Sequence, residues 1–164
     1  MNWLLLVIDL PSEPAYLRVK LGRRVQRFGA IGLKGAVYVL PDQREGLAAA
    51  ARFREETVAD GGQVTMLRAA VISGVSDGEL ERVFDRERRL EYAELVANCI
   101  ALEQRWADAL TEREIGACMS ERGRLFGRLE EILMRDFFGS TASEGAMQAI
   151  ERLARFGAGP GPFA

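Results

Sequence analysis

The fold is decided by the stretch Trp3-Leu4-Leu5-Leu6-Val7-Ile8, a continuous apolar run that ends at Asp9-Leu10-Pro11. Successive side chains of a strand point to opposite faces of a sheet. A run that is apolar at every position therefore predicts a strand covered on both faces. The run has no basic segment before it and meets an acid at Asp9, which is not the pattern of a signal peptide. We expect a buried central strand at the start of the chain.

A helix is predicted after this strand, with Ser12 as its N-cap and Pro14 in its first turn. Its buried stripe is expected from apolar residues at helical spacing, which are Leu17, Leu21, Val25 and Phe28. Cations recur at the same spacing on a neighbouring face, and these are Lys20, Arg23, Arg24 and Arg27. Gly29 is expected to end the helix.

Two short strands, a second helix and a fourth strand are predicted next. The strands cover 30–34 and 36–40 and pivot on Gly35, and the fourth strand covers 63–70 after the turn Gly61-Gly62. The helix covers 43–60, and its inner side is expected to hold Leu47, Ala50, Ala51, Arg54 and Val58. The order β-α-β-β-α-β predicts an α+β fold with a ferredoxin-like layer over residues 1–72.

The remainder of the chain is predicted to be an all-helical extension, residues 73–156, packed on that layer. Three capping-box patterns mark helix starts at Ser76, Thr111 and Thr141, each with a glutamate three residues later. The helices are expected to end near residues 110, 138 and 156, and the glycine- and proline-rich residues 157–164 are expected to form a flexible tail. Either these helices or a second subunit must cover the second face of the sheet.

Composition restricts the function more than it suggests one. The 164 residues contain no histidine, which removes the commonest general base, the histidine-dependent nucleophile pairs and most zinc sites. We therefore do not expect an enzyme. No cofactor is expected either. The two cysteines, Cys99 and Cys118, are too few for a disulfide framework and no run is long enough to span a membrane, so a cytoplasmic protein is predicted. Cys99 is expected in the core and Cys118 nearer the surface.

Charge is unevenly distributed although the net charge is only −2. Residues 14–41 contain six basic and no acidic side chains, whereas residues 71–164 contain 12 basic and 17 acidic ones. A local basic patch attracts polyanions, so the candidate nucleic-acid-binding residues are Lys20, Arg23, Arg24, Arg27 and Lys34. An ordinary solvated helix face is the alternative. No aromatic residue is interleaved to stack bases, so contacts with the DNA backbone are expected.

Two further residues are candidates for binding. Asp9 lies where the buried strand ends; it is either a cap of the following turn or a metal ligand that needs a second copy across a dimer axis. Arg88 interrupts the apolar stripe of the long helix, and Glu91 falls on the same face. They are either a structural ion pair or an arginine directed at an anion.

Three segments resemble the N-terminal domain of the chromate-resistance protein ChrB: Trp3 to Lys20, Leu21 to Ala30, and Lys34 to Asp42. The resemblance continues more weakly through Gly61-Gly62 and from Ser76 to Leu95. The same layer is similar to the Cas2-like module, including the one inside PaaX-type repressors. In Cas2 proteins an aspartate at the end of the first strand binds metal at the dimer axis, and Asp9 matches that position.

The resemblance implies a chromate-responsive transcriptional regulator, or a regulatory subunit, that binds DNA through the basic helix and forms a homodimer. One alternative is a Cas2-like nuclease that uses Mg²⁺ or Mn²⁺ at Asp9 of two subunits. A second alternative is a non-enzymatic module for oligomerisation or for binding chromate or another oxyanion, with Arg88 as the anion ligand.

Overall fold

A four-stranded antiparallel sheet and five helices make up the computed structural model, which describes residues 1–155. The predicted tail, residues 157–164, lies outside these residues. The strands are β1 (Asn2–Asp9), β2 (Ile31–Lys34), β3 (Val37–Pro41) and β4 (Gln63–Ala70). The helices are α1 (Tyr16–Phe28), α2 (Arg44–Ala59), α3 (Asp77–Ala107), α4 (Glu112–Leu133) and α5 (Ala142–Arg155).

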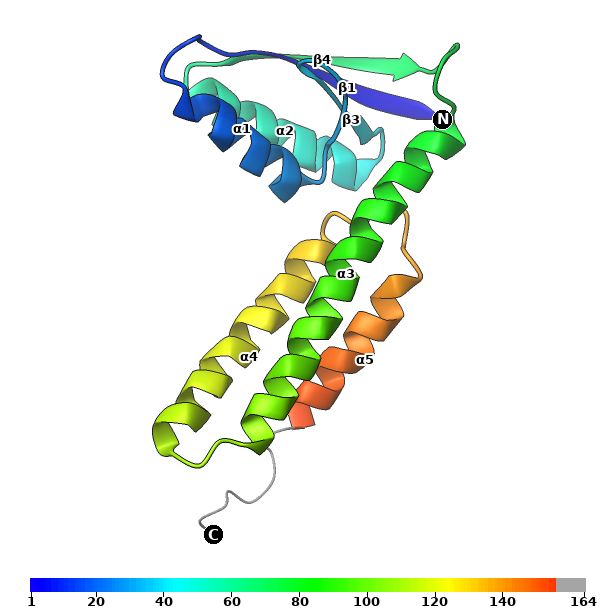
Figure 1. Cartoon of the computed structure of the whole chain (residues 1–164). Coiled ribbons are helices and arrows are strands. Elements are labelled where there is room, and N and C mark those ends of the chain that lie inside the picture. The colour runs from blue at the N-terminus through cyan, green and yellow to red at the C-terminus, as the bar shows by residue number, and fades with distance from the viewer. Residues whose placement is uncertain (156–164) are drawn as a thin grey trace. The chain divides into compact units, whose positions relative to one another are not determined.

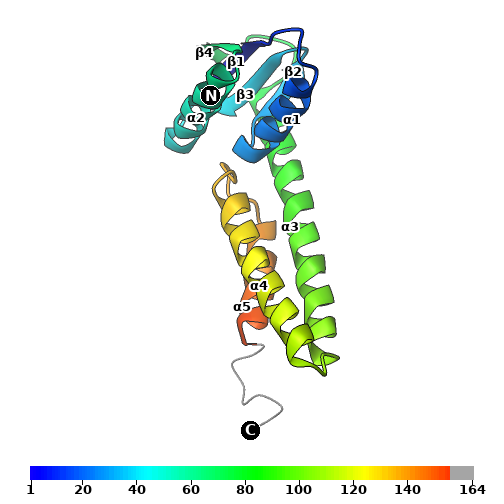
Figure 2. The same ribbon diagram turned by 90° about the vertical axis from the view of Figure 1, so that its left-hand side faces the viewer.

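The predicted β-α-β-β-α-β order is confirmed over the first seventy residues. The strands lie in the order β2-β3-β1-β4, so the apolar first strand is central. β1 pairs antiparallel with β3, where Leu5 faces Val39, and with β4, where Leu5 faces Leu67. Helices α1 and α2 lie side by side against one face of the sheet, as two perpendicular views show (Figures 1 and 2).

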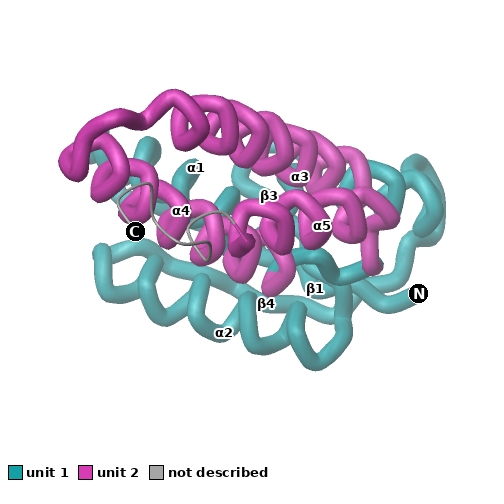
Figure 3. Tube along the Cα trace, turned by 90° about the horizontal axis from the view of Figure 1, so that it is seen from below, with its two compact units in different colours: residues 1–84, 135–138 teal, residues 85–134, 139–164 magenta. Residues whose placement is uncertain are grey.

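The chain divides into two compact units (Figure 3). The first contains Met1–Phe84 and Arg135–Phe138, and the second contains Asp85–Met134 together with the chain from Gly139 onward. Helix α3 therefore contributes its first two turns to one unit and the rest to the other. Sequence patterns place a boundary near residue 72, because that is where helical periodicity begins. The compact units instead divide within the helix.

In the first unit α1 and α2 cover one side of the sheet. Leu4, Leu6 and Ile8 pack with residues of α1 and α2, among them Leu21 and Phe53. The Phe53 ring lies 6.1 Å from Phe28 and 6.4 Å from Tyr38, centroid to centroid. This aromatic contact anchors α2 on the sheet.

The inner side of α2 differs from the prediction. Its buried residues are Gly46, Ala50, Phe53 and Thr57, whereas Leu47 and Val58 are exposed. Small apolar residues of this helix lie on several of its sides, so their spacing in the sequence does not single out one face. One long-range contact and one local contact decide which face is buried, since Phe53 enters the aromatic cluster and a side chain at Gly46 would collide with the Pro41 carbonyl.

The opposite face of the sheet is covered only at one end. Trp3 is buried there, stacked on Phe84 with ring centroids 5.9 Å apart and an interplanar angle of 11°. Phe138 lies 6.1 Å from the Trp3 ring and 5.5 Å from the Phe84 ring. Farther along the same face Val7 and Leu67 are exposed, by 39% and 49%. An apolar pocket of about 300 Å³ opens beside the covered end, between Trp3 and the segment after β4.

Helix boundaries follow local signals with three corrections. The capping boxes at Ser76 and Thr111 are confirmed by reciprocal hydrogen bonds with Glu79 and Glu114. Helix α1 begins at Tyr16 with no side-chain cap, rather than at Ser12, because the Leu17 amide already bonds the Pro14 carbonyl in a turn. α3 ends at Ala107 rather than near residue 110, and α4 at Leu133 rather than near 138.

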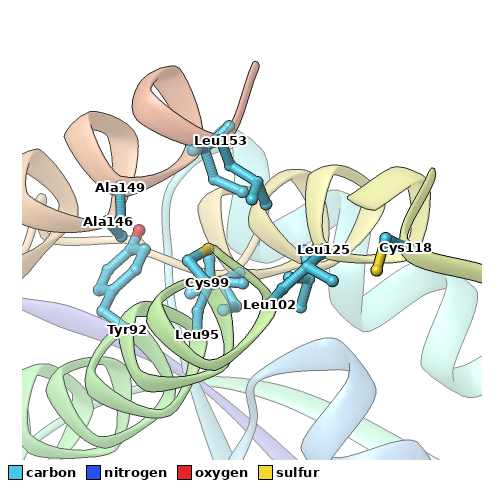
Figure 4. Packing of buried hydrophobic residues seen from close by; sticks show 11 residues of the cluster. Tyr92, Leu95, Cys99, Leu102, Cys118, Leu125, Ala146, Ala149 and Leu153 are labelled. Atoms are coloured by element: carbon cyan, nitrogen blue, oxygen red, sulfur yellow. The ribbon is translucent and has the colours of Figure 1, made fainter. Parts of the chain in front are cut away.

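The second unit is built from α4, α5 and most of α3. Its core contains Tyr92, Leu95, Cys99 and Leu102 from α3, at the spacing that the sequence predicts (Figure 4). Cys118 is also buried, 4% exposed, in contrast to the expected surface position. It lies seven residues before Leu125 and fourteen before Ile132, so the three share the buried side of α4. Among residues 1–155, no helix combines the length and hydropathy needed to cross a membrane.

We expect Phe84→Ala to reduce the free energy of unfolding by about 3–5 kcal/mol, because it removes the ring that covers Trp3 and leaves a cavity. Leu90→Ala, on the same helix but 62% exposed, is the control and should change it by less than about 0.5 kcal/mol. Urea unfolding followed by tryptophan fluorescence and circular dichroism measures both. Equal effects from the two substitutions would contradict this account of the sheet's second face.

Candidate nucleic-acid interface on the first helix

The cations of α1 fall into two groups. Lys20, Arg24 and Arg27 point toward α2, where Glu56 and Asp60 receive them. Arg23 is exposed and faces away from that contact. The predicted basic stripe is therefore partly an interhelical seam of five charged residues, which are three cations on α1, Glu56 on α2, and Asp60 at the C-cap of α2.

Arg24 lies at the centre of this seam and is only 5% exposed. Its Nε lies 3.1 Å from Oε2 of Glu56, its Nη1 donates to Oγ1 of Thr57 at 3.0 Å, and its Nη2 donates to Oδ2 of Asp60 at 2.6 Å. Thr57 in turn donates to the Phe53 carbonyl at 2.7 Å. The guanidinium has several donors in a fixed fork, so one buried side chain can engage three partners along a neighbouring helix.

Lys20 and Arg27 extend the seam toward its ends. The Lys20 Nζ lies 2.6 Å from Oδ1 of Asp60, and Arg27 pairs with Glu56. The side chains of both cations remain at least half exposed, 50% for Lys20 and 58% for Arg27. Exposed ion pairs are weak, and each of these cations is free to exchange its carboxylate for another anion.

The two cations beside Asp60 change the pKa of its carboxyl group. Its hydrogen bond from Lys20 and then that from Arg24 lower the pKa of this carboxyl below its ordinary value of 3.8. Asp60 is thus negatively charged throughout the neutral range, and it cancels part of the positive field of α1.

The outward-facing cations carry no such compensation. Arg18, Arg23 and Lys34 are exposed, and within residues 1–155 none of them forms an ion pair. Lys34 ends β2 beside the turn at Gly35, where the amide of Ile8 bonds the Ala36 carbonyl. It therefore lies at the end of the sheet where β1 finishes. Arg27, in the last turn of α1, precedes the start of β2 and is separated from Lys34 by the length of that strand.

Asp9 is exposed at the end of β1, opposite Gln63 of β4. In the part of the chain that the structure describes, no group of three or more histidine, cysteine, aspartate or glutamate side chains could hold a metal ion. Its role as a ligand across a dimer axis stays a prediction.

Arg88 is buried and its Nε lies 2.9 Å from Oε2 of Glu91. The other oxygen of Glu91 lies 3.3 Å from Nη2 of Arg128, so one carboxylate is shared by two cations. Of the two interpretations of Arg88, this geometry corresponds to the structural ion pair. Anion binding by Arg88 stays a prediction.

Sequence reasoning missed Glu56, Thr57 and Asp60 as partners of the basic helix. A signal for them exists. Glu56 lies on α2 and Asp60, four residues later, is the C-cap of that helix, so the two share a side, just as Lys20, Arg24 and Arg27 do on α1. Only the pairing of the two helices identifies the faces as complementary.

Comparison with known proteins agrees with the resemblance. Residues 18–158 match the family described as "Protein ChrB, N-terminal". A curated relative, Protein ChrB of Cupriavidus metallidurans strain CH34, is 27% identical over 141 residues, which cover 86% of this chain. The match covers 42% of the relative, so the chain spans less than half of that protein's length. No solved structure matches the chain significantly.

We expect Arg24→Ala to lower the free energy of unfolding by about 1–3 kcal/mol, because it removes the donor to the buried Thr57 hydroxyl and one of the two cations at each of Glu56 and Asp60. Arg23→Ala removes the same charge from the adjacent, exposed position and should change stability by less than about 0.5 kcal/mol. Chemical denaturation distinguishes them. Identical unfolding midpoints for the two variants would contradict the structural role of Arg24.

Asp60→Asn is expected to lower the melting temperature at pH 7 and to lose this effect in acid. The folded-state pKa of Asp60 is depressed, so its contribution to stability is complete above the ordinary value of 3.8 and disappears as pH falls through the lower folded value. The difference in melting temperature from the native protein should shrink below about pH 4. Glu55→Gln, at an exposed neighbouring position, is the control. A difference that stays constant from pH 7 to pH 3 would exclude the Asp60 ion pairs as its cause.

Proposed function

The chain belongs to the ChrB N-terminal family, the chromate-resistance family that its sequence resembles, and we propose that it is the DNA-contacting part of a chromate-responsive transcriptional regulator. The observation that carries this proposal is the uncompensated positive charge exposed on α1. Arg18 and Arg23 are exposed there with no ion pair among the described residues, and α1 contains no acidic residue.

The two groups of cations take different parts in this function. Arg24 is a positioning residue that fixes α1 against α2 and so holds Arg23 outward. Lys20 and Arg27 are half-exposed and can exchange Asp60 and Glu56 for phosphate oxygens when DNA approaches. The expected contacts are with the phosphate backbone, because phosphate oxygens receive most of the hydrogen bonds that exposed cations make with DNA and no aromatic residue is interleaved to stack bases.

We further propose that residues 1–70 form a ferredoxin-like module of the Cas2 type. The strand order β2-β3-β1-β4, the antiparallel pairing and the two helices on one face support this assignment. The exposed Asp9 at the end of β1 is compatible with it. A regulator needs no catalysis from this module, and we assign Asp9 no catalytic role.

Chromate is the proposed effector, and a homodimer is the proposed DNA-binding form. Both are proposed from the role that the family resemblance implies, and neither is argued from a particular side chain of this protein. The relative is more than twice as long as the matched region, so the oxyanion response of the whole regulator can involve residues beyond those matched here. The cytoplasm is the compartment in which such a regulator would meet DNA.

We expect the double variant Arg18→Ala/Arg23→Ala to bind duplex DNA about tenfold more weakly at low salt, since two phosphate contacts are removed. The slope of log K against log salt should fall by roughly 2. The control Arg52→Ala/Arg54→Ala removes the same charge from exposed positions of α2. It should leave the slope unchanged. Fluorescence anisotropy over a salt series measures affinity and slope together.

Three outcomes of this experiment would contradict the proposal. The first is an absence of DNA binding by the native protein at low salt. The second is an equal loss in the α1 and α2 variants, which would indicate a diffuse charge effect. The third is cleavage of the DNA when Mg²⁺ or Mn²⁺ is added, abolished by Asp9→Asn, which would favour the nuclease. Weaker DNA binding on addition of chromate would show that the matched region itself responds to the oxyanion.

A further inference from the structure

In the second unit, helix α3 has an open side opposite the one that packs on α4 and α5. Its buried side is formed by Tyr92, Leu95, Cys99 and Leu102. Ala97 points the other way, about 180° from the middle of that buried side at 100° per residue. Two perpendicular views show α4 and α5 on one side of α3 and no described helix of this unit on the other (Figures 1 and 2).

Exposed apolar side chains line this open side for about three turns. Leu90 is 62% exposed and Ile100 is 42% exposed. Ala93, Ala97 and Ala101 lie between or beside them and are exposed as well. All five fall within about 60° of Ala97 around the helix axis. A helix side that faces water is ordinarily polar, so this apolar strip is better matched to a contact with protein.

Charges of opposite sign lie at the two ends of the strip. Arg86 lies one turn before Leu90, and Asp108 lies one turn after Gln104. The Asp108 amide bonds the Gln104 carbonyl at 3.2 Å, so this residue continues the turn of the helix. At 100° per residue Arg86 and Asp108 fall about 20° to either side of Ala97. The strip is therefore basic at its start and acidic at its end.

Between these ends the centre of the strip is uncharged. Glu94, the charged residue nearest its middle, lies about 60° from Ala97 around the helix and so at the rim. The Arg86 side chain is 67% exposed and its guanidinium lies 3.8 Å from Glu87, the next residue along the chain. So long and exposed an ion pair is weak, and Arg86 can exchange it for another carboxylate.

We infer that this side of α3, from Arg86 to Asp108, binds the same side of a second copy of the chain, with the two helices antiparallel and Ala97 beside the two-fold axis. Charge complementarity selects the second copy as the occupant. Ala97 is eleven residues from both Arg86 and Asp108, so the axis brings Arg86 of one copy to the height of Asp108 of the other. The two are about 40° apart around the helix, roughly 4 Å at its surface, which an arginine side chain spans. This pair forms twice.

Large residues of one copy meet small residues of the other in the same register. The two-fold axis reverses height along the helix and keeps each residue on its flank. Ile100 and Ala93 share one flank, about 60° and 40° from Ala97, and differ by only about 1.5 Å in height between the copies. Leu90 and Ala101 share the other flank, about 20° and 40° from Ala97, and differ by about 4.5 Å. The surface is thus complementary to itself, as an isologous contact requires.

This contact deepens the proposed function, on which it rests for its purpose, because a dimer doubles the basic surface available to DNA. One pair of helices forms a small interface, so the association is weak and the chain is monomeric at about 1 µM. Unfolding followed at that concentration therefore reports on the monomer, in which Leu90 is exposed. Dimerisation is measured without DNA, so its failure is distinguishable from a failure of DNA binding.

The first test is sedimentation equilibrium of the full chain under reducing conditions, between about 1 and 500 µM, a range that includes weak association. We expect the native chain to pass from monomer to dimer. Arg86→Glu should weaken the dimer about tenfold, because a carboxylate then lies beside Asp108 of the second copy. The exchange Arg86→Glu/Asp108→Arg should restore it to within about threefold. Arg113→Glu, an equal charge reversal at an exposed position of α4, should have no effect.

The second test is a cross-link at the axis. Ala97→Cys places two thiols face to face, so mild oxidation should join the copies by a disulfide. Asn98→Cys is the matched control, since the next residue is also exposed but points about 100° away. The native cysteines do not interfere, because Cys99 and Cys118 are buried. Non-reducing electrophoresis over time measures both rates, and we expect Ala97→Cys to cross-link at least tenfold faster.

Three results would overturn the inference. One is a native chain that stays monomeric up to about 500 µM. Another is a dimer that the charge exchange between Arg86 and Asp108 fails to restore. The third is equal cross-linking of Ala97→Cys and Asn98→Cys, which would place any contact between copies elsewhere on the chain.

Discussion

An apolar strand at the centre of a sheet must be shielded on both of its faces, and much of the first unit follows from this requirement. Helices α1 and α2 cover the face of Leu4, Leu6 and Ile8. The opposite face obtains its cover from segments far along the chain, the first turns of α3 and the short stretch around Phe138. The indole of Trp3 also donates to Asp77 at 2.7 Å, so the start of α3 is held by a hydrogen bond as well as by ring packing. These contacts hold the first turn of α3 against the sheet.

The same helix packing decides what the basic helix can do. Covering the sheet places α1 beside α2, and a guanidinium that enters the contact has to find acceptors because an unpaired buried charge is costly. Glu56, Thr57 and Asp60 satisfy it. A helix that reads as one basic stripe thus serves two purposes. Part of the stripe holds the layer together, whereas Arg23 stays exposed to solvent, as does Arg18 elsewhere on the helix. Any substitution that includes Arg24 therefore changes stability along with charge.

Charge and apolar surface are partitioned differently in the two units. In the first, exposed cations gather on α1, which supports an anionic partner. In the second, acids and bases pair along and between helices, as at Glu91 with Arg88 and Arg128. This distribution suits a protein that contacts a polyanion through the first unit.

The sequence by itself determined the features that depend on neighbours along the chain. Apolar continuity located β1, helical spacing located the core of α3, and the capping boxes at Ser76 and Thr111 located two helix starts. The local cation density of α1 was equally visible. The tertiary structure alone decided which face of the alanine-rich α2 is buried, that Cys118 lies in the core, and that Phe138 joins Trp3. It also decided that Arg24 is a buried structural residue whereas Arg23 is exposed. These outcomes depend on which surfaces meet, and residues far apart in sequence come together only after the sheet and helices have packed.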